Sequence, residues 1–130
     1  MTEQALTVDD DAAALLARMA RKELYIISNR SLVPAGDLHS LLKQHLLYMI
    51  DLERAGTLFA SGPVFDETGA MTGDGVTIVR AASFADAQRI ADEDPFVKSA
   101  LRTPSVRRWV VNEGRLTISV DLSSGTGACL

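Results

Sequence analysis

The sequence predicts an α+β fold of the ferredoxin-like type, in which two helices cover one face of an antiparallel sheet. Strand-like and helix-like segments alternate from residue 23 onward in the order strand, helix, strand, strand, helix, strand. The length of 130 residues suits one domain. A hydrophobic fraction of 47% and a charged fraction of 23% are ordinary for a globular protein. We therefore expect one ferredoxin-like βαββαβ sandwich with an extra C-terminal strand.

Residues 1–22 precede this pattern and are predicted to be an extension with a short helix. Three aspartates at 9–11 lead into the alanine- and leucine-rich stretch 12–22, which ends in basic residues, as the helix macrodipole favours. The start lacks the basic region and apolar core of a signal peptide, and no apolar run approaches the roughly 20 residues needed to span a bilayer. With one cysteine, Cys129, the chain cannot form an internal disulfide. We expect a cytoplasmic protein that does not bind membranes.

The first strand is predicted over 23–28, where leucine, tyrosine and isoleucine suit a pleated sheet. A connection then leads to a helix over 37–55, whose apolar side chains recur with the helical period. Asp37 is the predicted N-cap of this helix, and Gly56 is in the usual position to end it.

A second and a third strand are predicted on either side of a glycine-rich segment. The second strand runs over 57–60 and ends at Ser61-Gly62-Pro63. Residues 64–75 are predicted to be a long flexible connection because they combine three glycines with two aspartates. The third strand is expected over 76–81.

The last predicted helix begins with a side-chain cap. Ser83 and Asp86 have the spacing of a capping box at the start of a helix that runs to about residue 93. Asp94 and Pro95 then restart a short helical turn, with aspartate as the cap and proline in the first helical position. The remaining expectations are strands over 106–111 and 115–120 joined by a tight turn at 112–114, a main domain over 23–122, and a flexible tail over 123–130.

The predicted strands carry apolar side chains on both faces of the sheet. Residues 24–27 are all apolar, and Trp109 lies in another apolar run. Since two helices cover only one face, the other face would be a large exposed patch, which usually marks an interface. We expect a homodimer that packs sheet to sheet. An edge-on dimer, or a monomer covered by the N-terminal helix and the tail, are the alternatives.

Charge and motifs exclude several classes of ligand. The net charge is −4, and no basic stripe offers a surface for phosphate groups, so we expect no nucleic-acid binding. No glycine-rich phosphate loop precedes a helix, and no second histidine or cysteine stands at metal-ligand spacing. We therefore expect no metal, no cofactor, and a small molecule as the ligand.

His45 is the strongest candidate for chemistry. It falls on the apolar stripe of the helix over 37–55, where a leucine would be expected, and so faces the sheet. A neutral imidazole exchanges protons readily near pH 7, and a carboxylate on one ring nitrogen would fix its tautomer. Asp94 is the candidate carboxylate. The structural alternatives are a hydrogen-bonded core histidine and an aspartate that only caps a helix.

Further candidates surround His45. In Ser61-Gly62-Pro63, the glycine would let a ligand approach the backbone and the serine hydroxyl would orient a polar group, although the same residues suit a plain strand end. Tyr48 lies one turn from His45 and is predicted at the rim of the pocket. Phe96 is a further ligand-binding candidate, although an aromatic residue there is also typical of a core or an interface.

Together these residues resemble the YciI-like (YCII-related) family. The resemblance covers Glu23 to Val120, and its landmarks are the runs 45–49 and 52–58, Ser61-Gly62-Pro63, Asp94-Pro95-Phe96, Trp109 and the turn at 112–114. It implies a dimeric α+β barrel, a His–Asp pair at His45 and Asp94, and a site serine at Ser61. Some relatives are enzymes of aromatic degradation, including a dehydrochlorinase. Relatives commonly have glycine where this chain has Ala100, which would narrow the pocket by a methyl group if it lined it.

The leading functional prediction is a small enzyme with His–Asp acid/base chemistry. The reaction would be an isomerisation, elimination or dehydrochlorination of a small cyclic or aromatic organic compound, without a cofactor. The alternative is a non-catalytic metabolite-binding or accessory protein that uses the same pocket.

Overall fold

The computed structural model describes residues 10–129. Residues 1–9 of the predicted N-terminal extension lie outside the described residues. The chain divides into two compact units, one of residues Glu23–Val110 and one made of the two ends of the chain, up to Lys22 and from Val111 on. The first unit contains all the candidate site residues predicted above.

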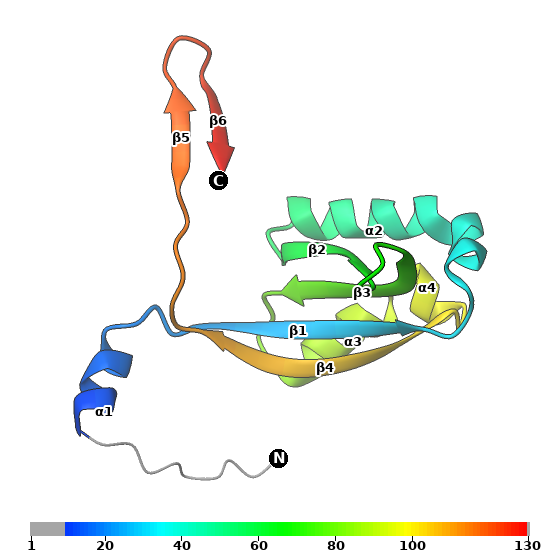
Figure 1. Ribbon diagram of the computed structural model, residues 1–130, viewed down its shortest axis with the longest axis horizontal. Coiled ribbons are helices and arrows are strands. Elements are labelled where there is room, and N and C mark those ends of the chain that lie inside the picture. Colours follow the sequence, from blue (N-terminus) through cyan, green and yellow to red (C-terminus); the bar gives the residue numbers. More distant parts are fainter. Residues whose placement is uncertain (1–9, 130) are drawn as a thin grey trace. The chain divides into compact units, whose positions relative to one another are not determined.

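The main unit has the predicted ferredoxin-like fold. Its sheet has the strand order β2-β3-β1-β4, and β3 pairs antiparallel with both β1 and β2. Figure 1 shows the helices of this unit beside its sheet. In chain order the elements are β1 (Lys22–Ser31), the 3₁₀ helix η1 (Ala35–Leu41), α2 (Leu42–Arg54), β2 (Leu58–Phe65), β3 (Met71–Val79), α3 (Phe84–Asp92), α4 (Pro95–Lys98) and β4 (Arg102–Val111).

One face of the sheet is covered by helices. In β3, the odd-numbered residues from Gly73 to Val79 are buried and the even-numbered ones are partly exposed, which is the alternation of a sheet with one covered face. Helix α3 packs on that face through Ala87 and Ala91. The buried cluster that they form with the strands consists of Ile27, Val79, Ala87, Ala91 and Val106.

The predicted helix over 37–55 is two elements. A 3₁₀ helix, η1, occupies its first turns, and α2 begins only at Leu42. Asp37 is inside η1, and neither η1 nor α2 has a side-chain cap, so the predicted cap is wrong. Gly56 follows α2 with a φ of 78°, the left-handed conformation that glycine adopts at a helix end.

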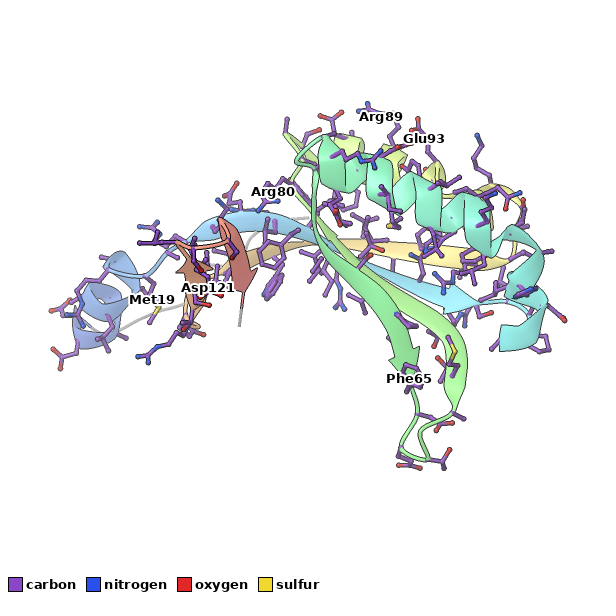
Figure 2. The ribbon with its side chains drawn as sticks, turned by 90° about the horizontal axis from the view of Figure 1, so that it is seen from above. Met19, Phe65, Arg80, Arg89, Glu93 and Asp121 are labelled. Atoms are coloured by element: carbon purple, nitrogen blue, oxygen red, sulfur yellow. The ribbon has the colours of Figure 1, made fainter. Side chains whose placement is uncertain are left out.

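The predicted flexible connection over 64–75 is mostly strand. Strand β2 continues to Phe65 and β3 begins at Met71, so Ser61-Gly62-Pro63 lies inside a strand rather than at its end. Asp66 closes the turn, since its carboxylate accepts hydrogen bonds from the Thr68 hydroxyl and from the N–H groups of Thr68 and Ala70. These bonds, led by that of the Thr68 hydroxyl, lower the pKa of Asp66. Asp66, which suggested flexibility in the sequence, therefore orders the turn between β2 and β3. Figure 2 labels Phe65, the last residue of β2, next to this turn.

Both predicted caps before the later helices are present. The Ser83 hydroxyl accepts a hydrogen bond from the Asp86 N–H at the start of α3. Asp94 caps α4, with Pro95 as the first helical residue.

The unit formed by the chain ends differs from the prediction in its strand pairing. It contains α1 (Asp10–Ala17), β5 (Ile118–Asp121) and β6 (Thr126–Cys129). Strand β5 pairs antiparallel with β6 and not with β4, so the turn at 112–114 does not join paired strands, and the predicted tail contains a strand. The turn between them is closed by Gly125, whose φ is 68° and whose N–H donates to the Asp121 carbonyl. No helix among residues 10–129 is long and apolar enough to cross a membrane.

Candidate active site

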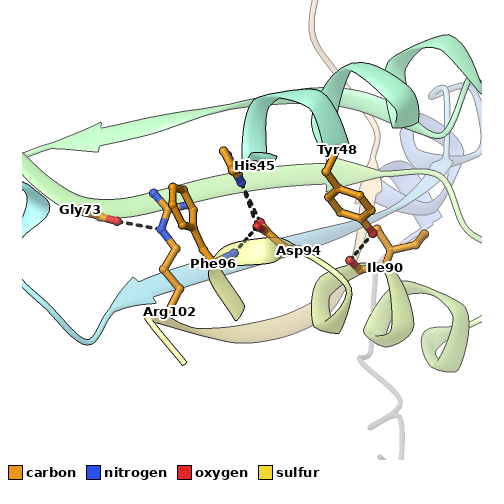
Figure 3. Close-up of polar contacts among 7 residues, drawn as sticks. All are labelled: His45, Tyr48, Gly73, Ile90, Asp94, Phe96 and Arg102. Carbon is orange, nitrogen blue, oxygen red and sulfur yellow. Dashed lines mark hydrogen bonds and ion pairs between the residues drawn. The ribbon is translucent and has the colours of Figure 1, made fainter. Parts of the chain in front are cut away.

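His45 and Asp94 are in direct contact. The Nδ1 atom of His45 on α2 lies 2.9 Å from Oδ1 and 3.1 Å from Oδ2 of Asp94 (Figure 3). An ionised carboxylate only accepts hydrogen bonds, so Nδ1 carries the proton. In the neutral ring, Nε2 is therefore the atom with a free lone pair.

Asp94 is both a helix cap and the partner of His45. Its Oδ1 atom accepts a hydrogen bond of 3.0 Å from the Phe96 N–H, and the residue is only 2% exposed. A buried carboxylate is costly unless it is hydrogen-bonded, and here two donors meet it. The two interpretations that the sequence left open for Asp94 thus hold together, since the cap geometry also fixes the carboxylate against the imidazole.

The ring of Phe96 packs on the imidazole. The two ring centroids are 4.5 Å apart and the planes are inclined by 21°. Phe96 is 1% exposed, so the aromatic surface is part of the protein interior while its neighbour His45 keeps 13% of its side chain exposed. The stacking and the Asp94 contact together restrict rotation of the His45 ring.

A cavity of about 600 Å³ lies where η1 and α2 cover β2 and β3. This volume is in the range of small-molecule sites. The cavity contains His45, Ser61, Gly62, Pro63 and Phe96, five of the seven predicted site residues. In the part of the chain that the structure describes, Nε2 of His45 has no hydrogen-bond partner. The other residues that line the cavity are Ala35, Gly36, Leu38, His39, Leu42, Leu46, Met49, Met71, Gly73, Gly75, Val76, Thr77 and Arg102.

The serine of the predicted motif has a position in the sheet that suits a ligand contact. Ser61 on β2 stands opposite Thr77 on β3, and both residues line the cavity. The register shifts between Pro63 and Phe65, so the strand is irregular next to the cavity. Two hydroxyl groups therefore lie on the sheet side of the site.

Tyr48 is not part of the cavity. Its hydroxyl donates a hydrogen bond of 2.7 Å to the Ile90 carbonyl, so it ties α2 to α3 (Figure 3). Burial, with the charges of Glu93 and Asp94, raises the pKa of Tyr48 to about 12. The phenol stays protonated near neutral pH and serves as a structural donor.

Arg102 is a cavity residue that the sequence prediction missed. It begins β4, is 8% exposed and donates from Nε to the Gly73 carbonyl at 2.9 Å, while its guanidinium carbon lies 4.7 Å from the centroid of the Phe96 ring. Burial lowers the pKa of this guanidinium, whereas the charges of Asp94 and Asp74 raise it. The strand predicted over 106–111 began after Arg102, which left Arg102 in a connection. If that strand is extended back by four residues, Arg102 and Val106 lie on the same face of the sheet, because side chains alternate along a strand.

The chain matches the YCII-related domain over residues 15–110. The chain belongs to the YCII-related family. This confirms the family resemblance on which the prediction of a His–Asp pair was based. A search of curated protein sequences finds no match to the chain.

A solved structure with the same fold is 5-chloro-2-hydroxyhydroquinone dehydrochlorinase from Burkholderia phenoliruptrix AC1100, in complex with 2,5-dihydroxybenzoquinone. It superposes with a TM-score of 0.56 at 22% sequence identity, covering 66% of this chain and 92% of the dehydrochlorinase. The similarity supports the ferredoxin-like fold of this YCII-related chain.

Ala100 does not narrow the cavity, contrary to the possibility raised by the sequence. It is exposed, is absent from the cavity lining and follows α4 with a φ of 59°. This is the left-handed conformation that glycine adopts without strain. A preference for glycine at position 100 therefore follows from the positive φ of the backbone and not from the space that a ligand needs.

Proposed function

We propose that this YCII-related protein is a small-molecule enzyme in which His45 transfers protons and Asp94 orients it. The reaction class is isomerisation, elimination or dehydrochlorination of a cyclic or aromatic compound. One observation carries the proposal: Nε2 of His45 is left without a partner among the described residues in a ring that lines the cavity, while Nδ1 is held by a buried carboxylate.

The chemistry follows from the protonation pattern of the pair. With its proton on Nδ1, His45 presents the lone pair of Nε2 and can accept a proton from a ligand carbon or hydroxyl. The resulting imidazolium is stabilised by the carboxylate of Asp94 at Nδ1. The same Nε2–H then returns the proton to another atom of the ligand or to water. Such acid/base catalysis contributes on the order of 10²–10⁴-fold to a rate.

The dehydrochlorinase with the same fold supports this reaction class. Loss of hydrogen chloride from a ring needs a base that takes up a proton, and His45 is placed to be that base. The apolar part of the cavity, with Leu38, Met49 and Phe96, suits a flat ring. The hydroxyl groups of Ser61 and Thr77 suit the oxygen substituents of such a ring.

We also propose that the protein is a homodimer that packs through the uncovered face of the sheet. Ile26 and Ile78 are paired on β1 and β3 and alternate with the residues that face the helices. Both are only partly buried in the single chain. An apolar sheet face of this kind is stabilised when a second copy covers it.

The function is tested by a thermal-shift screen of small aromatic acids, lactones and phenols, including 2,5-dihydroxybenzoquinone. Wild type, His45→Ala and the control Gln44→Ala are compared, because Gln44 is an exposed neighbour on the same helix that does not line the cavity. A ligand of the folded state raises the melting temperature by mass action. Compounds that stabilise the protein are then incubated with it, and the product is identified by mass spectrometry.

We expect at least one compound to stabilise wild type and Gln44→Ala, to be converted by both, and to be left unchanged by His45→Ala. Binding of compounds without conversion by wild type would contradict the enzymatic function and favour a binding protein. If His45→Ala unfolds at a lower temperature and no compound stabilises any variant, His45 is a core hydrogen-bonding residue.

A further inference from the structure

We propose that Arg102 binds an anionic group of the ligand, so that the cavity takes a small aromatic compound carrying a carboxylate or an ionised hydroxyl group. This inference deepens the proposed function and rests on it for the identity of the reacting group, His45. It assigns the part of the ligand that does not react.

The guanidinium of Arg102 has N–H donors that are free to bind a ligand. Its Nε atom donates to the Gly73 carbonyl, but neither of its two terminal nitrogens has a hydrogen-bond partner among the described residues. In the described part of the chain, the fully buried side-chain nitrogen or oxygen without a hydrogen-bond partner is Oδ1 of Asn29. The terminal nitrogens of Arg102 also have no partner but are not in that class, so they are not fully buried. Arg102 lines the cavity, so an oxygen of a ligand can reach the free donors.

The terminal nitrogens have a defined position over β3. A Cβ atom added at Gly75 would lie 3.0 Å from Nη1 and 3.3 Å from Nη2 of Arg102. The absence of a side chain at Gly75 therefore leaves the room that the guanidinium occupies. Together with the Gly73 hydrogen bond and the contact with Phe96, this fixes the charge in one place.

Arg102 determines the charge of the cavity. No other lysine, arginine, aspartate or glutamate lines it in the described part of the chain. The two carboxylates whose charge acts on Arg102 are directed elsewhere: Asp94 binds His45 and the Phe96 N–H, and Asp74 accepts from the Ser31 N–H and lines a second hollow. Among the described residues that line the cavity, the charged side chain that an anion meets is thus the guanidinium of Arg102.

Arg102 and His45 both contact the ring of Phe96, and both line the cavity. The imidazole centroid lies 4.5 Å and the guanidinium carbon 4.7 Å from the same Phe96 centroid, so the two groups are separated by no more than the sum of these distances. Figure 3 shows both beside Phe96. Because both residues line the same cavity, we expect a ring whose anionic substituent binds Arg102 to present its other atoms to Nε2 of His45.

The first test uses wild type with two probes of the same shape, benzoate and benzamide, measured by calorimetry at low salt. A charge-assisted hydrogen bond to arginine corresponds to a preference for benzoate of at least about tenfold. Equal affinities for the two probes would overturn the proposal, and this result needs no variant to fold.

Three variants then assign the preference to Arg102, each checked first for folding by circular dichroism. Arg102→Met keeps the length of the side chain and is expected to bind both probes equally, while Arg102→Lys keeps part of the preference. Gly75→Ala keeps the charge but displaces the guanidinium, so the preference is expected to fall by about threefold or more. If folded Arg102→Met still prefers benzoate as strongly as wild type, another group binds the anion.

His45→Gln separates this proposal from the proposed function. We expect it to retain the preference for benzoate and to lose conversion of any substrate. If the preference depends on Arg102 but no compound is converted by wild type, the anion site stands and the enzymatic function fails. If conversion depends on His45 but benzoate and benzamide bind alike, the enzyme stands and the anion site fails.

Discussion

Substitutions of Asp94 separate its two roles, capping α4 and holding His45. In Asp94→Ser, the shorter hydroxyl still caps the helix through the Phe96 N–H but no longer meets Nδ1 of His45. In Asp94→Ala both contacts are lost. In Asp94→Asn the amide oxygen can still accept from the Phe96 N–H and from Nδ1 of His45, but the charge is removed and the second carboxylate oxygen is replaced by an NH2 donor.

The expected losses of stability follow from these contacts. Removing the charged partner of His45 costs about 1.5–3 kcal/mol, because a hydrogen bond to an ionised group is lost. Removing the cap costs about 1 kcal/mol more. We therefore expect the free energy of unfolding to fall in the order wild type, Asp94→Ser, Asp94→Ala, with the two variants separated by about 1 kcal/mol.

Urea unfolding at neutral pH measures these differences, with fluorescence of Trp109, the one tryptophan of the chain, as the probe. All variants are compared at one protein concentration, since assembly would change the apparent stability. Equal stability of Asp94→Ser and wild type would refute the reasoning, because the contact with His45 would then contribute nothing. Equal stability of Asp94→Ser and Asp94→Ala would show that Asp94 does not cap α4.

Three further predictions concern the backbone, the phenol and the assembly. Ala100→Gly is expected to raise the free energy of unfolding by up to about 1 kcal/mol, because φ is 59° there, and a loss of stability in urea would contradict this. The pKa of Tyr48 is raised from 10.0 to about 12, so its contribution is complete below pH 10 and is lost as the pH rises through 12. Wild type should therefore lose stability more steeply than Tyr48→Phe over this range, and parallel curves would exclude the assignment. Light scattering at micromolar concentration should give the mass of a dimer, and Ile78→Asp should give that of a monomer; a monomeric wild type would rule out the sheet-to-sheet packing.

Much of the fold was predictable because the sequence signals are local. The helical phase placed His45 towards the sheet, and the caps at Ser83 and Asp94 marked helix starts that the structure confirms. The contact between His45 and Asp94 joins residues 49 positions apart, and it was predictable only with the family resemblance.

The features that were missed depend on contacts that composition does not encode. Glycine and aspartate in 64–75 suggested flexibility, but the hydrogen bonds of Asp66 fold these residues into a hairpin. Arg102 precedes the strand predicted over 106–111, and arginine is mostly exposed in proteins, so the sequence did not mark it as a cavity residue. Its burial depends on Gly73, Gly75 and Phe96, which only the tertiary structure brings to it.

The central claim is that Nε2 of His45 transfers the proton in the reaction of this cavity. The most direct test is the rate of conversion of a compound found in the screen by wild type and by His45→Gln, both saturated with it. We predict that the variant binds the compound but converts it at least about 100-fold more slowly, the lower bound for acid/base catalysis. A rate for His45→Gln within threefold of wild type would contradict the claim.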